Sequence, residues 1–131
     1  MTVFEDRRAG EAEIAERNGL AGRVAEALAA AGFAVHRDAD DGLAPLGARV
    51  SVDPGNDSRG GVFVQWATDL ALVPDARQDV RAVDFASPEF RHFRFVTEHM
   101  HATLVAVLGS AGFRAEAAGD DMNPYLVHVT G

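Results

Sequence analysis

Two long stretches of the chain carry apolar residues at three- and four-residue spacing, which is the pattern of one face of a helix. The first stretch covers residues 5–31, and its apolar positions are Ile14, Ala21, Val24, Ala25, Leu28 and Ala31. Asn18 and Gly19 interrupt it, so the pattern predicts either one helix with a kink near Asn18 or a separate helix that Asn18 caps. Gly32 is expected to end this element.

The second helical stretch is predicted to run from Pro88 to about Ser110. Ser87 suits the capping position, Pro88 suits the first helical position, and Glu89 lies in the first turn. The apolar stripe of this helix consists of Phe93, Val96, Met100, Leu104, Val107, Leu108 and Ala111. Gly112 is expected to end the helix.

Alternating apolar and polar residues predict β-strands in the rest of the chain. The clearest pair covers residues 48–53 and 62–67, which flank a loop rich in turn-forming residues and predict a hairpin. Shorter strands are expected at residues 33–36, 113–116 and 125–129. Residues 76–83 fit either a short helix or an ordered loop.

These elements predict one domain that spans residues 1–131, in the order α-β-β-β-(loop)-α-β-β. Hairpins without regular βαβ alternation indicate an α+β fold, with an antiparallel sheet of about five strands and two main helices on one face. The two halves match when the chain is shifted by 80 residues, because residues 31–33 and 111–113 are both Ala-Gly-Phe. An internal duplication and the repeated use of a good helix-to-strand junction both account for this match.

The order of elements resembles the type III secretion chaperone-like fold, which includes the YbjN-like family of small bacterial proteins. The resemblance covers nearly the whole chain, through helices at 11–31 and 88–110 and strands at 33–36, 48–53, 62–67, 113–116 and 125–129. Families of this kind are small, acidic, usually dimeric and non-enzymatic, and they bind protein segments. The resemblance therefore implies a chaperone-like interaction module, although a fold alone does not fix a function.

Composition excludes several functional classes. The chain has 131 residues, of which 20 are acidic and 12 are basic, so its net charge is −8. This balance argues against nucleic acid and anionic membranes as partners, since both require basic surface. The chain has no cysteine, which excludes disulfides, thiolate catalysis and cysteine-bound metals. No stretch has the ~20 apolar residues of a membrane span, and the first 30 residues hold no signal-peptide-like stretch, so a cytoplasmic location is expected.

The sequence offers no motif for a metal site. His92 and His99 share a helix, but they are seven residues apart, which is about 10 Å along the axis and too far to share one metal ion. The acidic turns at residues 38–42 and 53–61 do not match the ligand spacing of a calcium-binding loop. We therefore expect no metal and no cofactor.

Catalytic motifs are also missing from the sequence. There is no Gly-x-Ser-x-Gly nucleophile elbow and no glycine-rich phosphate loop before a helix. His36 and His128 are predicted on strands, and a histidine with Glu116 could transfer a proton across a sheet. Since nothing marks a pocket there, we expect no catalytic residue, and enzymatic activity stays an open alternative.

The second helix has a further stripe beside its core stripe. Its members are His92, Phe95, His99, Ala102 and Ala106. Apolar flanks of surface helices often mark partner surfaces, so we predict a homodimer or partner interface that uses Phe90, His92, Phe95 and His99. In the other interpretation, this stripe is part of a broad core-facing surface that residues 69–86 cover.

Two functional hypotheses follow. The first is a cytoplasmic, non-enzymatic protein-interaction or chaperone-like module that acts as a homodimer or binds another protein. The second is a small-molecule binding protein or minor enzyme, with a cavity between the sheet and the helices near Trp66, Tyr125 and His128.

Overall fold

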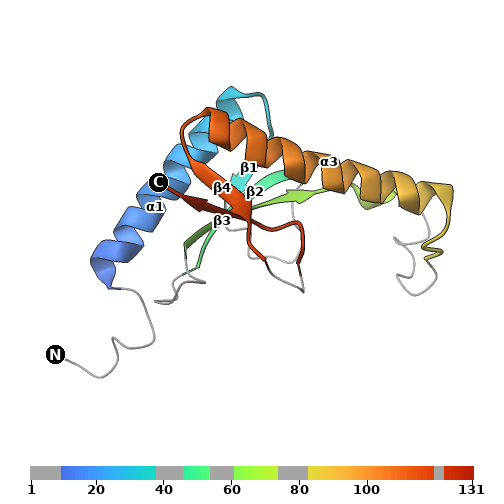
Figure 1. Cartoon of the computed structure of the whole chain (residues 1–131), viewed down its shortest axis with the longest axis horizontal. Coiled ribbons are helices and arrows are strands. Elements are labelled where there is room, and N and C mark those ends of the chain that lie inside the picture. Colours follow the sequence, from blue (N-terminus) through green and yellow to red (C-terminus); the bar gives the residue numbers. More distant parts are fainter. Residues whose placement is uncertain (1–9, 38–45, 54–60, 74–82, 120–122) are drawn as a thin grey trace, which may run out of the picture.

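The computed structural model describes residues 10–37, 46–53, 61–73, 83–119 and 123–131. The elements in chain order are α1 (Glu11–Ala30), β1 (Val35–Arg37), β2 (Gly47–Asp53), β3 (Gly61–Ala67), the short 3-10 helix η2 (Leu70–Leu72), α3 (Pro88–Ser110), β4 (Arg114–Ala117) and β5 (Val127–Thr130) (Figure 1). The predicted α+β class and the predicted order of elements are confirmed. The turns predicted at 38–42 and 53–61 and the segment at 76–83 lie wholly or almost wholly outside the described residues.

Helix α1 is one continuous element of 20 residues. It runs through Asn18 and Gly19, so the prediction of a separate helix beginning at Asn18 was wrong. The reason is tertiary packing: Val24 and Leu28 are fully buried against the sheet, and this burial outweighs the roughly 1 kcal/mol that each glycine costs a helix.

Both long helices end in the same motif, which explains the repeated Ala-Gly-Phe sequence. Gly32 and Gly112 each have a φ angle of 100°, which glycine adopts without strain. The amide of Phe33 then donates to the carbonyl oxygen of Leu28 (3.1 Å), and the corresponding bond in α3 is 3.0 Å long. Because this phenylalanine belongs to the helix end, β1 and β4 begin one or two residues later than predicted.

The five strands form one sheet in the order β1-β2-β3-β5-β4. Three of the four neighbouring pairs are antiparallel, but β1 and β2 are parallel, so the prediction of a purely antiparallel sheet was wrong for this pair. Alternation along a strand indicates which face is buried, and it carries no information on the direction of the neighbouring strand. Nothing in the local pattern of residues 33–53 could therefore have shown the parallel pairing.

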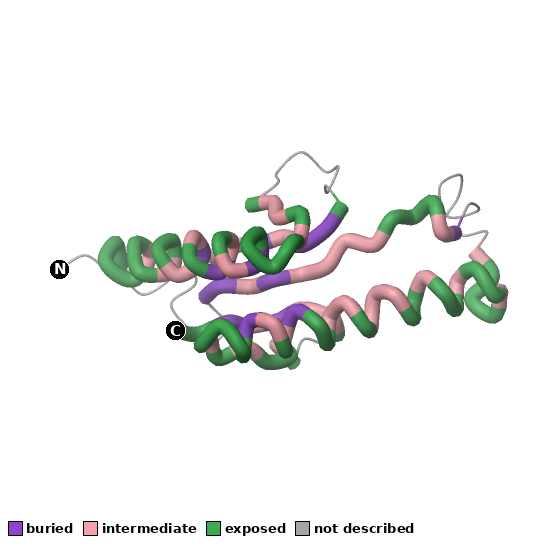
Figure 2. Tube along the Cα trace, turned by 90° about the horizontal axis from the view of Figure 1, so that it is seen from above, coloured by how far each residue is buried: buried purple, intermediate pink, exposed green. Residues whose placement is uncertain are grey.

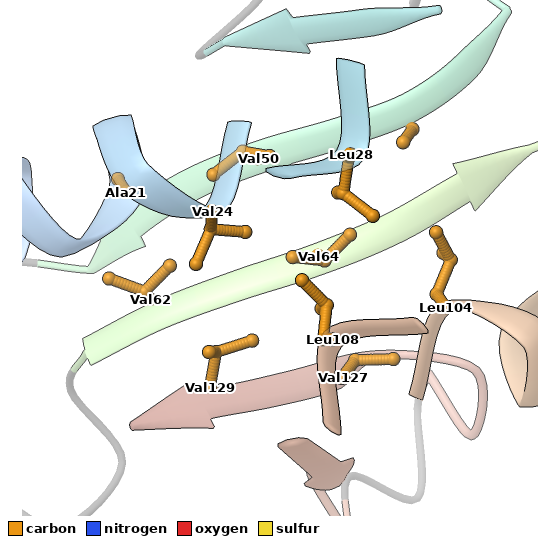
Figure 3. Close-up of a cluster of buried hydrophobic side chains, with 11 residues drawn as sticks. Ala21, Val24, Leu28, Val50, Val62, Val64, Leu104, Leu108, Val127 and Val129 are labelled. Carbon is orange, nitrogen blue, oxygen red and sulfur yellow. The ribbon is translucent and has the colours of Figure 1, made fainter. Parts of the chain in front are cut away.

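The hydrophobic core lies between the two helices and one face of the sheet, as predicted. Val24 and Leu28 of α1 and Leu104 and Leu108 of α3 point toward valines of the central strands (Figure 3). Eleven residues make up this buried cluster: Ala21, Val24, Leu28, Ala48, Val50, Val62, Val64, Leu104, Leu108, Val127 and Val129. Because inward residues alternate along each strand, the other face of the sheet carries the intervening side chains.

Only the C-terminal half of α3 contributes fully buried residues to the core. The helix has 23 residues, and it runs beyond the end of the strands (Figure 1). Its fully buried residues are Leu104 and Leu108, whereas its N-terminal half has only half-buried and exposed positions (Figure 2). Helix α3 also contacts η2, and the hydroxyls of Thr68 and Thr97 are 2.7 Å apart.

Candidate functional site: the outer face of α3

A row of exposed residues follows the side of α3 that points away from the sheet. Phe95 precedes the buried Leu104 by nine residues, and nine steps of about 100° place the two side chains on opposite sides of the helix. Phe95 is 56% exposed and Leu104 is fully buried. We define the outer face of α3 as six exposed residues in this row: His92, Phe95, His99, Ala102, Ala106 and Gly109.

Local contacts hold the two largest side chains of the outer face in place. The rings of Phe95 and His99 are stacked, with centroids 3.8 Å apart and an interplanar angle of 23°. Nδ1 of His99 donates a hydrogen bond to the carbonyl oxygen of Phe95 (2.8 Å). Because the two side chains are already ordered, they would lose little conformational entropy when a partner binds them, which favours binding.

The six residues of the outer face include no Asp, Glu, Lys or Arg, but the exposed Arg91 precedes Phe95 by four residues and borders the same side of the helix. The four charged residues of α3 are Glu89, Arg91, Arg94 and Glu98, and all of them precede His99. Nε of Arg94 donates to Oε1 of Glu98 (2.9 Å), and the hydroxyl of Tyr125 donates to the same oxygen (3.0 Å). These hydrogen bonds, first that of Arg94 and then that of Tyr125, hold the pKa of Glu98 below its ordinary value.

The structure separates Phe90 from the other three predicted interface residues. Phe90 is half-buried, and its ring packs edge-on against Phe85 (4.8 Å) and is stacked with Phe93 (6.2 Å). Phe90 precedes Phe95 by five residues, which turns its side chain away from the outer face by about 140°. His92, Phe95 and His99 do share one face, and described residues 69–73 and 83–86 leave all three exposed.

The structure separates two of the residues proposed for a ligand cavity, Trp66 and His128. Trp66 points to the helix side of the sheet, where its ring packs edge-on against Phe33 at 6.0 Å. His128 lies on the opposite face, stacked on Phe63 with ring centroids 5.1 Å apart. The alternation of residues 125–129 could have indicated this separation, because it places His128 opposite the buried Val127 and Val129.

His128 instead borders an open groove between α1 and the ends of β3 and β5. The groove has a volume of about 690 Å³, and its lining includes Glu16, Leu20, Arg23, Gly61 and His128. Sequence reasoning missed this groove, since it arises where an end of the sheet meets the flank of a helix.

Of the residues considered for proton transfer, the structure brings together only His128 and Glu116. Glu116 is the cross-strand neighbour of His128. His36 lies on β1, three strand spacings or about 14 Å from β5, and its Nε2 donates to the carbonyl oxygen of Leu46 (3.0 Å). In the described ranges, no three His, Cys, Asp or Glu side chains come close enough to hold a metal ion.

No protein-family model, curated protein or solved structure matches this chain. The resemblance to the type III secretion chaperone-like fold therefore stays a prediction. Among the helices of the described segments, none has the length and apolar character needed to cross a membrane.

Proposed function

We propose that this protein is a non-enzymatic protein-interaction module that acts as a homodimer in the cytoplasm, with the outer face of α3 as its contact surface. The observation that carries the proposal is the stacked pair of Phe95 and His99, which is exposed and held in place by its own helix. Contiguous apolar patches on a surface mark protein contacts, and on this face Phe95 lies in one row with His99, Ala102 and Ala106.

The size of this surface predicts a weak dimer. A phenylalanine presents about 200 Å², so the exposed 56% of Phe95 is about 110 Å², and covering it contributes about 3 kcal/mol per copy. The outer face is about 26 Å long and about 10 Å wide, and its area of about 260 Å² is well below the ~800 Å² per partner of a stable complex. We therefore expect a dissociation constant in the micromolar to millimolar range.

The mass in solution of matched variants tests this proposal. Light scattering at high protein concentration compares the wild type with Phe95→Glu and with the control Phe85→Glu. Phe85 is 68% exposed and precedes α3, but it lies outside the outer face. We expect the wild type and Phe85→Glu to associate equally and Phe95→Glu to stay monomeric.

Thermal unfolding of each variant at low concentration serves as the control for folding. Equal masses for the wild type and Phe95→Glu would exclude the outer face as the contact surface. A monomeric wild type would exclude the homodimer.

A second candidate function is the binding of a small molecule, or a minor enzymatic activity, in the groove between α1 and the sheet. The observation in its favour is the volume of about 690 Å³, which lies within the range of small-molecule sites. A thermal-shift screen that gives the same melting temperature with every compound would count against this candidate.

A further inference from the structure

We infer that two copies of this chain pair through α3 in an antiparallel arrangement, about a two-fold axis that passes between Met100 and His101. This inference rests on the proposed function and adds the orientation and register of the contact. A two-fold axis sets each residue against the one that lies equally far on the other side of the axis. Side-chain size, charge and one glycine support this register.

Side-chain size divides the outer face into two halves with mirrored spacing. The three ring-bearing residues precede the axis at intervals of three and four, and the three small residues follow it at intervals of four and three. The two-fold axis therefore sets Phe95 of one copy against Ala106 of the other. His99 then faces Ala102. A parallel pair would instead set ring against ring, which would hold the helices apart and leave a gap between the small residues.

Gly109 supports the same register. A Cβ atom built at this position would meet nothing within 4 Å, so the chain's own packing does not require a glycine there. Glycine is a poor helix former, and yet this one lies in the last turn of α3. In the antiparallel pair, Gly109 faces the imidazole ring of His92 from the second copy, and the missing side chain provides room for that ring.

The distribution of charge favours the antiparallel orientation as well. The four charged residues of α3 all precede the axis, and residues 99–110 carry none. An antiparallel pair sets the charged half of each helix beside the uncharged half of the other. A parallel pair would bring Arg91, Arg94 and Glu98 close to their own copies, and it would also align the two helix dipoles.

Disulfide trapping tests the register, since the natural chain has no cysteine and every introduced thiol is unique. We would prepare His92→Cys and Gly109→Cys, two exposed positions that leave Phe95 and His99 in place. A disulfide needs Cα atoms within about 7 Å. In the antiparallel pair, residues 92 and 109 of different copies meet this condition, whereas two copies of residue 92 are about 25 Å apart along the axis.

Mild oxidation of the mixed variants is therefore expected to give a covalent heterodimer, and each variant alone is expected to stay uncoupled. A mixture of His92→Cys with Ala29→Cys, an exposed position on α1, measures the yield of random collisions. We expect the yield for His92→Cys with Gly109→Cys to exceed this background at least tenfold.

The possible failures are distinguishable. If each variant alone formed a disulfide-linked homodimer and the mixture gave no covalent heterodimer, the antiparallel register would be overturned while the homodimer stands. A yield equal to the background, in a protein that light scattering shows to be dimeric, would also overturn the register. A wild type that is monomeric by light scattering would overturn the proposed function as well.

Discussion

Leu104 and Phe95 lie nine residues apart on opposite sides of α3, and truncating each of them should affect a different property. Leu104 is fully buried among valines of the sheet, so Leu104→Ala removes buried methyl groups and leaves a cavity. Such changes cost about 3 kcal/mol or more. Phe95 is 56% exposed, so Phe95→Ala should cost only about 1 kcal/mol, although it removes the larger side chain.

Urea denaturation at low protein concentration measures these two costs in the monomer. With a denaturant slope of about 1.5 kcal/mol per M, Leu104→Ala should lower the midpoint by about 2 M and Phe95→Ala by less than about 0.7 M. A chain of this length has roughly 7–20 kcal/mol of stability, so both variants should remain folded.

Self-association should respond in the opposite way. Phe95→Ala is expected to weaken the dimer strongly, and Leu104→Ala is expected to leave it unchanged under conditions in which the variant is folded. If Phe95→Ala lowered the urea midpoint as much as Leu104→Ala, then Phe95 would belong to the core. The assignment of the outer face would then be wrong.

Four further predictions concern the fold. The lowered pKa of Glu98 means that its ion pair with Arg94 stabilises the protein above pH 4.5, and that this contribution disappears as the pH falls through the lowered value. Urea midpoints between pH 3 and 6 should therefore fall less steeply toward acid in Glu98→Gln than in the wild type, and equal slopes would refute this. A Cβ at Gly61, where φ is 139°, would lie 2.9 Å from a histidine ring nitrogen on β5, so Gly61→Ala should destabilise by more than about 1 kcal/mol. Gly109→Ala meets open space and should be neutral or stabilising, and a lower melting temperature for Gly109→Ala than for Gly61→Ala would contradict the structure. The hydroxyl of Ser87 accepts a hydrogen bond from the amide three residues later (3.1 Å), so Ser87→Ala should cost about 1 kcal/mol in thermal unfolding, whereas Ser87→Asp should cost little.

The elements of this fold could be predicted where local chemistry determines them. Ser87 caps α3 as expected, because its side chain satisfies an amide that the helix leaves open. The alternation of residues 48–53 and 62–67 correctly gave the central hairpin. Two features depend on contacts between distant segments and were missed. They are the parallel pairing of β1 with β2 and the continuity of α1 through Gly19.

The candidate site was only partly predictable for the same reason. His92, Phe95 and His99 share a face because helical spacing alone fixes their directions. The same spacing turns Phe90 inward, so a stricter use of the helical period would have separated Phe90 from the interface. The proposed cavity was wrong because Trp66 and His128 point to opposite faces of the sheet, which the alternation of residues 125–129 already indicates for His128.

The most direct test of the central claim is the mass of the wild-type chain by sedimentation equilibrium, over concentrations from about 10 μM to about 1 mM. The account predicts an average mass above the monomer value of 13.9 kDa, rising toward twice that value as concentration increases. A mass that stays at 13.9 kDa throughout this range would contradict the claim that the outer face of α3 joins two copies of the chain.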